Sequence, residues 1–268
     1  VSFGRRIGAC QHPGIGLKSQ FGTMGKPYNA GIAAANAIEV CGLARRGFTS
    51  AADGLGGPQG FLPAHHPQHE SCDQILPDAV KSSFMFADVR HKLHACCHGT
   101  HAMIEGLRNL VAAHDVTQHN LVGLTIRVNP RWLKVCDIKA PTTGLEVKFS
   151  YVFLAAMVLH HIDTAAYQSY DDSICDDAGF IATANKITVI GDEAIGDGAV
   201  SMSADTQDGA HHTTDFDLMD PIDLAVLGPR LVAKAAVLIG AARAEKIWES
   251  MDDLDSMPAA QMAHYLQA

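Results

Sequence analysis

The chain has 268 residues, of which 47% are hydrophobic and 18% are charged, and its formal net charge is −9. This composition is typical of a soluble globular protein of one or two domains, and the acidic balance argues against a nucleic-acid-binding surface. The sequence has no uninterrupted apolar run of about 18 residues, so we expect no membrane-spanning segment. Seven cysteines without a disulfide-framework spacing indicate reduced thiols, and we therefore expect a cytoplasmic protein.

A lysine stands in a glycine-rich turn directly before an alanine-rich segment. Small and apolar residues recur at steps of three and four over residues 27–46, which predicts a helix, and Gly47 is expected to end it. The free N–H groups of a helix start carry partial positive charge, so Lys26 would add a full charge where anions bind. A nucleotide-binding loop is excluded, because Gln20 and Pro27 occupy its glycine and serine or threonine positions. The alternative is that Lys26 is a solvated lysine.

A second informative segment carries four histidines at steps of three, four and three: His91, His94, His98 and His101. On a continuous helix these side chains would share one face. The last three of them, together with Cys97, have side chains that ligate zinc, so a zinc-binding module is one hypothesis. The alternative is a polar helix start with partly exposed histidines.

The middle of the chain changes from helical to extended patterns. Residues 120–128 alternate and are rich in β-branched side chains, which predicts a strand, and residues 187–190 and 199–203 are further strand candidates. A helical period resumes after residue 220, so residues 218–268 are expected to form two or three helices.

Several segments, in their order and spacing, resemble the MmgE/PrpD family, which includes 2-methylcitrate dehydratases, cis-aconitate decarboxylases and iminodisuccinate epimerases. These segments are residues 21–31 (FGTMGKPYNAG), 46–49 (RGFT) and 57–61 (GPQGF). Residues 92–105 resemble the family's Lys-x-x-x-x-Cys-x-x-x-His-x-x-Ile-Asp element. Residues 143–150 (TGLEVKFS) resemble its Glu-Ala-Lys-Phe-Ser segment.

The sequence also departs from the family pattern. Gly25, Tyr28 and Asn29 replace residues of the usual Thr-Lys-Pro-Leu-His core, and Phe153 stands where some members carry an active-site tyrosine. Family members are longer, and their N-terminal helical region carries further active-site residues that have no counterpart in this sequence. The resemblance therefore covers only the C-terminal part of the family, and we expect a homodimer that needs a separate N-terminal segment, or an incomplete enzyme.

The resemblance implies a mostly α fold with an inserted α+β lid, in which an all-helical domain is built from N- and C-terminal segments. We place the helical domain, which would be incomplete, in residues 1–89 and 217–268. The lid would comprise residues 90–216.

The resemblance also implies a site for a small di- or tricarboxylate that uses no metal and no cofactor. We predict catalytic roles for Lys26, Lys92 and His101. We predict substrate-binding roles for Thr23, Asn29 and Cys97.

The function that the resemblance implies is that of a lyase of the 2-methylcitrate dehydratase type, an activity of propionate metabolism, working by proton abstraction next to a carboxylate. Fixed cations would stabilise the charge that builds on the substrate in the transition state. The alternatives are an epimerase or isomerase, or a decarboxylase, of the same family. A non-catalytic fragment of the fold is the hypothesis from a different class.

Overall fold

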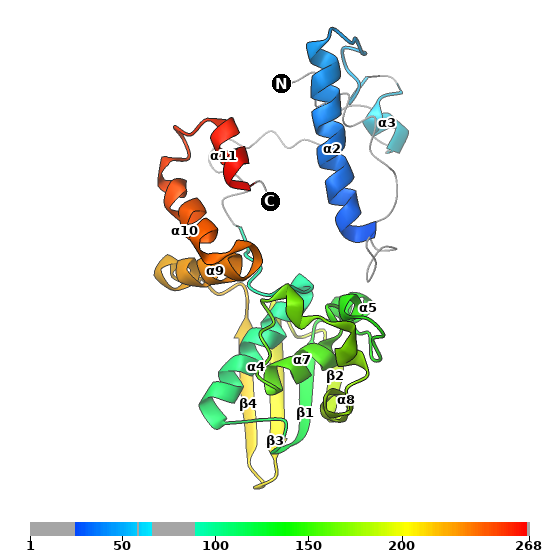
Figure 1. The fold of residues 1–268 in the computed structure, drawn as a ribbon. Coiled ribbons are helices and arrows are strands. Elements are labelled where there is room, and N and C mark those ends of the chain that lie inside the picture. The colour runs from blue at the N-terminus through cyan, green and yellow to red at the C-terminus, as the bar shows by residue number, and fades with distance from the viewer. Residues whose placement is uncertain (1–24, 58, 66–88, 267–268) are drawn as a thin grey trace. The chain divides into compact units, whose positions relative to one another are not determined.

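In the computed structural model, the described residues are 25–57, 59–65 and 89–266. They belong to two compact units, residues 1–90 and 91–268, which we describe separately (Figure 1). The first unit contributes α2 (Gly25–Arg45) and α3 (Phe61–His65). Within the described ranges, no helix combines the length and the apolar character needed to cross a membrane.

The helix predicted over residues 27–46 is confirmed as α2. It ends where the sequence places a glycine, because Gly47 has a φ of +81°, a left-handed conformation that glycine adopts without strain. The amide of Phe48 then turns back and donates to the carbonyl of Leu43 over 3.1 Å. This contact satisfies one of the carbonyl groups that a helix end leaves open.

The second unit is built on a four-stranded sheet with the strand order β2-β1-β3-β4. The strands are β1 (Leu121–Val128), β2 (Ile187–Gly191), β3 (Ala199–Thr206) and β4 (His211–Asp217). β1 is parallel to β2 and antiparallel to β3, and β4 pairs antiparallel with β3. Parallel neighbours need a crossover connection, and here helices fill the chain between β1 and β2. The three predicted strands are confirmed, and β4 is an addition to them.

The helices of the second unit lie before, between and after the strands. They are α4 (His101–His114), α5 (Pro130–Cys136), α6 (Gly144–Val147), α7 (Tyr151–Leu159), α8 (Ala178–Ala184), α9 (Leu224–Ile239), α10 (Ala241–Glu249) and α11 (Ala259–Leu266). Short 3₁₀ turns are η4 (His98–Thr100), η5 (Tyr167–Ser169), η6 (Asp172–Cys175) and η7 (Ser250–Asp253). The helices predicted after residue 218 are confirmed as α9, α10 and α11.

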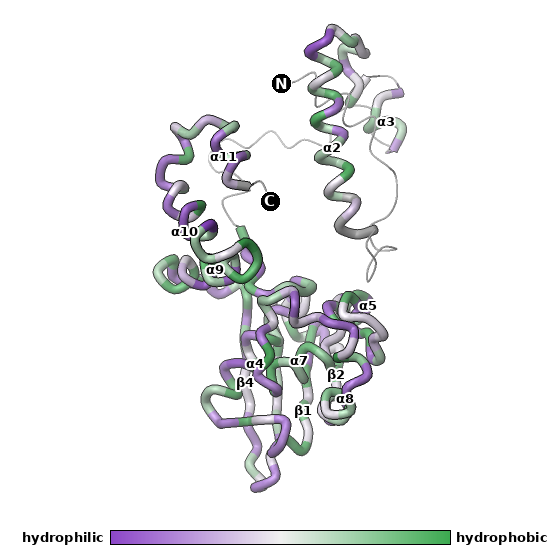
Figure 2. Tube along the Cα trace, in the orientation of Figure 1, coloured by the Kyte–Doolittle hydropathy of each residue, from purple (hydrophilic) through white to green (hydrophobic). Residues whose placement is uncertain are grey.

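The core lies between the sheet and the two helices α4 and α7, which cover one of its faces (Figure 1). On β1 the side chains of Leu124, Ile126 and Val128 are buried, whereas Arg127 between them is exposed. All nine residues of α7 are buried, and Figure 2 shows this helix as apolar along its length. A helix without a polar side must be covered all round, and α7 packs against α4, α8 and β2.

The predicted fold class, mostly α with an inserted α+β lid and an all-helical domain made of N- and C-terminal segments, is wrong. The described residues contain a mixed sheet as well as helices, and α9 to α11 belong to the compact unit that holds the sheet. Arg230 of α9 joins this unit through an ion pair with Glu105. An amphipathic period shows that a helix buries one face, but not which partner covers that face. The predicted domain bounds, 1–89 with 217–268 and 90–216, stay predictions.

Candidate functional site

The chain approaches α4 through an irregular segment and one 3₁₀ turn, so the four histidines do not share the face of a continuous helix. His98 lies in η4 and only His101 lies in α4. The backbone amide of Cys97 donates to the carbonyl of Lys148 over 3.0 Å, and the hydroxyl of Thr100 donates to the carbonyl of Cys97 over 2.7 Å. These contacts hold the turn in place and bring side chains from both sides of it together.

Two aromatic side chains contact this turn at Gly99. A Cβ atom on Gly99 would lie 2.3 Å from the ring of Trp132, so only a glycine lets the backbone lie this close to the ring. The hydroxyl of Tyr151 donates to the carbonyl of Gly99 over 2.7 Å, and burial raises the pKa of this hydroxyl. Tyr151 is therefore a structural residue, and the buried Phe153 offers no hydroxyl at the position of the family's tyrosine.

A buried row of hydrogen-bonded side chains comprises Thr164, His94, Glu105 and Arg230. Oε1 of Glu105 accepts from Nε2 of His94 over 2.8 Å and from Nη2 of Arg230 over 2.7 Å. Nδ1 of His94 lies 2.7 Å from Oγ1 of Thr164. Burial lowers the pKa of His94, so the neutral ring donates to Glu105 and accepts from Thr164. Burial alone would raise the pKa of Glu105, but the hydrogen bonds from His94 and Arg230 hold it at about 2.

His101 packs beside this row with one ring nitrogen unsatisfied. Its side chain is 1% exposed, and its ring centroid lies 5.0 Å from that of His94 and 5.0 Å from that of His98. Nε2 of His101 is buried and has no hydrogen-bond partner among the described residues. Burial, then the neighbouring histidines and lysines, lower the pKa of His101 to about 2, so the ring is neutral. Leaving a buried polar atom unpaired costs about 1–3 kcal/mol of stability. Such an unpaired atom is a frequent sign of a binding role.

Two lysines lie near the His101 ring. Nζ of Lys92 donates to the carbonyl of Cys96 over 3.1 Å, and Nζ of Lys234, from α9, donates to the carbonyl of Lys92. Burial and then the charge of Lys92 lower the pKa of Lys234. The two ammonium groups and the neutral rings of His98 and His101 form what we call the cationic cluster. Within the described segments, neither lysine has a carboxylate within 4 Å.

The two cysteines beside the cluster are packed as thiols. Burial raises the pKa of Cys96 to about 11, and its Sγ lies 3.2 Å from Oγ1 of Thr100. Cys97 is also buried, and its predicted role in substrate binding stays a prediction. The described residues hold no group of three or more His, Cys, Asp or Glu side chains placed to share a metal ion. Because His94 already uses both ring nitrogens, the zinc hypothesis has no support in this part of the chain.

Three of the predicted site residues come from the N-terminal unit. Lys26 and Asn29 lie in the first turns of α2, but their side chains are not among those described. Thr23 lies outside the described residues. The roles predicted for these three residues stay predictions. Of the predicted residues, the structure brings Lys92, Cys97 and His101 together in the second unit.

Sequence reasoning missed Thr164, Arg230 and Lys234 as members of this site. Arg230 and Lys234 stand four residues apart, so they lie on the same side of α9. Two cationic residues at this spacing in an otherwise apolar helix are visible in the sequence, and they could have indicated these two members of the site. No comparable pattern marks Thr164, which lies 70 residues from His94 along the chain.

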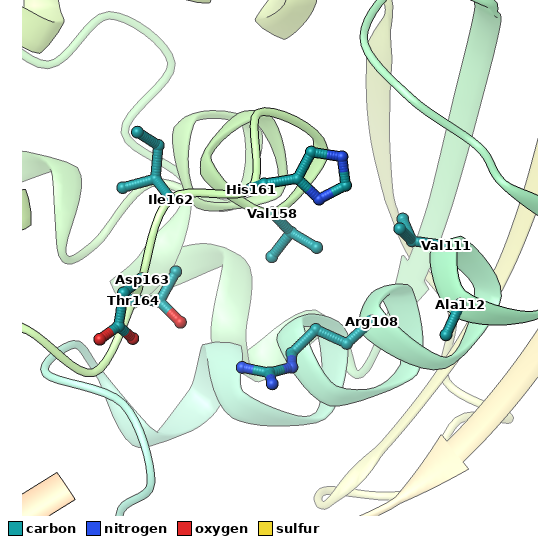
Figure 3. A pocket seen from close by; sticks show the side chains of 8 residues that line it. All are labelled: Arg108, Val111, Ala112, Val158, His161, Ile162, Asp163 and Thr164. Carbon is teal, nitrogen blue, oxygen red and sulfur yellow. The ribbon is translucent and has the colours of Figure 1, made fainter. Parts of the chain in front are cut away.

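A pocket of about 380 Å³ lies between α4 and the chain that follows α7 (Figure 3). Its α4 side consists of Arg108, Val111 and Ala112, and residues 161–164 form much of the other side. Figure 3 shows the side chain of Arg108 extending from α4 toward the segment that carries Thr164. Because Thr164 also contacts His94, the pocket adjoins the buried row without including any of the predicted site residues.

Acid is expected to destabilise the second unit through its buried histidines. The pKa values of His94 and His101 are lowered in the fold, so the unfolded chain binds protons near pH 6.5 that the folded chain does not. Each group then lowers the free energy of unfolding by up to about 1.4 kcal/mol per pH unit as the pH falls below 6.5. The lowered pKa of Glu105 adds a further loss of stability below pH 4.5. We expect the urea midpoint to fall steadily from pH 7 to pH 5, and a flat midpoint would contradict the neutral state of both rings.

Residues 94–217 match the family model described as the MmgE/PrpD C-terminal domain. The matched segment contains His94, His101, Glu105 and all four strands, and it ends before α9. No curated protein matches the chain. The MmgE/PrpD family is generally enzymatic and includes dehydratases and related lyases and isomerases. The segment that holds the turn, the buried row apart from Arg230 and the ring of His101 therefore matches the MmgE/PrpD C-terminal domain.

Proposed function

We propose that this protein is a lyase of the 2-methylcitrate dehydratase type, which binds a small di- or tricarboxylate and removes a proton from the carbon next to a carboxylate. The observation that carries the proposal is the unpaired Nε2 of His101, which is buried beside two lysines. The fold loses stability by leaving that atom unpaired, and a ligand that pairs with it would recover the loss.

The cationic cluster favours an anionic ligand. Lys92 and Lys234 place two ammonium groups near His101, and no carboxylate among the described residues lies within 4 Å of either one. Fixed cations in a partly buried site interact with a carboxylate more strongly than they would in water. The overall charge of −9 would repel anions at long range, so binding would depend on this local reversal of sign.

Ligand binding would also turn His101 into a base. With a pKa of about 2, the free ring holds a lone pair but binds protons poorly. A carboxylate placed beside the ring favours its charged form and raises its pKa, so His101 would become basic only when the substrate is present. This coupling would limit proton transfer to the occupied site.

In the proposed dehydration, Nε2 of His101 takes a proton from the carbon next to a carboxylate. The electron pair of that C–H bond forms a carbon–carbon double bond while the C–O bond on the neighbouring carbon breaks. The departing hydroxide takes a proton from an ammonium group, for which we propose Lys92, and leaves as water. The other cations would stabilise the negative charge on the substrate carboxylates as the C–H bond breaks.

An epimerase is the second candidate, because it needs the same proton abstraction followed by return of the proton to the opposite face. The buried Phe153 favours it over a decarboxylase, since no tyrosine hydroxyl stands at that position. The predicted homodimer, the contributions of Lys26, Thr23 and Asn29, and the need for a separate N-terminal segment remain part of the proposal. A fragment without activity is the remaining alternative.

The proposal is tested by thermal-shift titration with citrate, 2-methylcitrate, cis-aconitate and an aspartate-like diacid. We expect one acid to stabilise the protein, by about 2.7 kcal/mol at a concentration of 100 Kd, and this effect to be absent in Lys92→Ala. The stabilising acid is then assayed for loss of water, for loss of carbon dioxide and for inversion at the carbon that bears the proton. Water loss supports the lyase, and inversion alone supports the epimerase.

Lys139→Ala is the matched control, because it removes the same charge from an exposed side chain, which forms an ion pair with the partly buried Asp137. It should leave the acid-induced shift unchanged. If no acid stabilises the unmodified protein, the proposed function is wrong for this chain. An equal loss in Lys139→Ala and Lys92→Ala would show that the effect depends on net charge rather than on the site.

A further inference from the structure

We propose that Lys234, from helix α9, is a second carboxylate-binding residue of the site, and this inference rests on the function proposed above. The segment that matches the family model ends at residue 217, so it includes neither Lys234 nor the helix that carries it. The argument uses the anchoring of α9, the contacts of the lysine and the charge around it.

The position of Lys234 is fixed by the residue one turn before it. Arg230 donates to Oε1 of Glu105 over 2.7 Å, and the side chain of Glu105 is only 10% exposed. Asp223 begins α9 by accepting the amide of Ala225 over 2.8 Å. Residues four apart on a helix lie on the same side, so the anchor at Arg230 directs Lys234 toward the buried row.

The ammonium group of Lys234 keeps hydrogen-bonding capacity for a ligand. An ammonium group has three N–H donors, and in the described residues Lys234 uses one of them, on the carbonyl of Lys92. This contact places its charge close to the charge of Lys92, and the two repel each other. A carboxylate beside each lysine would offset that repulsion and accept from the remaining donors.

Two separate ammonium groups favour a ligand with at least two carboxylates. Lys92 lies in the segment before α4 and Lys234 in α9, so the two charges are supplied by elements that are far apart in the sequence. One lysine can then bind each carboxylate, with His101 beside the carbon that reacts. A ligand with one carboxylate would leave one ammonium group without a counter-charge.

The test compares binding of citrate, succinate and butyrate by calorimetry in the unmodified protein and in Lys234→Gln, Lys234→Ala and Lys92→Ala. Glutamine keeps an N–H donor for the carbonyl of Lys92 but removes the charge. We expect Lys234→Gln to weaken binding of citrate or succinate by about 10- to 100-fold, the value of a charge-assisted hydrogen bond, and to leave butyrate binding within about twofold. Urea midpoints close to that of the unmodified protein would show that the variants fold.

Lys246→Ala is the control, because Lys246 lies in the next helix with its charge over the ring of Tyr265. It should bind citrate and succinate as the unmodified protein does. If Lys92→Ala loses binding and Lys234→Gln does not, the inference is wrong and the proposed function stands. If glutamine restores the binding that alanine loses, Lys234 has only a structural role, which also overturns the inference. If no acid binds the unmodified protein, both proposals fail.

Discussion

Gly144→Ala is expected to lower the free energy of unfolding by about 3 kcal/mol, the upper part of the usual range for an overpacked core. A Cβ atom at this position would lie 1.8 Å from the carbonyl oxygen and 2.5 Å from the carbonyl carbon of Tyr170. Both are backbone atoms, so no side-chain rotation can relieve the clash. The amide of Gly144 also donates to the carboxylate of Asp172 over 2.7 Å, which fixes the two segments at this distance.

The effect of Gly144→Ala should extend to the site. The hydroxyl of Tyr170 donates to the carbonyl of Thr164 over 2.8 Å, and the ammonium of Lys148 lies 4.9 Å from the centre of the Tyr170 ring. Moving the Tyr170 backbone would therefore displace Thr164, the hydrogen-bond partner of His94. We expect weaker acid binding together with the loss of stability.

Urea unfolding of Gly144→Ala and of Gly123→Ala would measure this effect against a matched control. Gly123 lies in β1, and the nearest atom to an added Cβ would be the carbonyl oxygen of Lys186 at 3.9 Å, an ordinary contact. The control should change the free energy of unfolding by less than about 1 kcal/mol. Equal urea midpoints for both variants would show that the contact between Gly144 and Tyr170 leaves room for an added methyl group.

His101→Phe is expected to lower turnover sharply while keeping or raising stability. Phenylalanine fills a similar space between His94 and His98, and it removes the buried nitrogen that has no partner in the described residues. Removing an unpaired buried group should stabilise the fold by about 1 kcal/mol. Loss of the proposed base should lower the rate by about 10²- to 10⁴-fold. The pH dependence of the urea midpoint should also become shallower, since one of the two histidines no longer titrates.

His114→Phe is the matched control, because His114 lies at the end of α4 and stacks on His212, away from the cationic cluster. It should leave acid binding and turnover unchanged. A large destabilisation by His101→Phe would mean that Nε2 is paired in the folded protein. Unchanged turnover would exclude His101 as the base.

The parts of the fold that follow from local pattern could be predicted from the sequence. The helix period of α2 and the alternation of β1 are properties of short segments, and both elements were found. β4 was missed because its residues, His211 to Asp217, are nearly all polar, which is typical of an edge strand exposed on one side. β4 forms because β3 supplies a complete ladder of hydrogen bonds, and that information lies outside the strand.

The candidate site could be predicted only in part, for a related physical reason. His101 and Lys92 are predicted through a resemblance in one segment, whereas the histidine spacing by itself suggests a shared face on a continuous helix. Tertiary contacts override the helical spacing of the histidines. The backbone amide of Cys97 donates to the carbonyl of Lys148, and this contact keeps the segment before α4 from forming a continuous helix. Lys234 makes its contact 142 residues from its partner Lys92, a distance that no local pattern reports.

The pairing of Glu105 with Arg230 has a consequence for biosynthesis. The two residues are 125 positions apart, so at about 5–20 residues per second a ribosome makes Arg230 roughly 6–25 s after Glu105. During that interval the carboxylate of Glu105 has only His94 as a partner, and Lys92 emerges without Lys234. The nascent domain can therefore complete its sheet, whose last strand ends at Asp217, before it can assemble the cationic cluster. Ligand binding would begin only after α9 has emerged and docked.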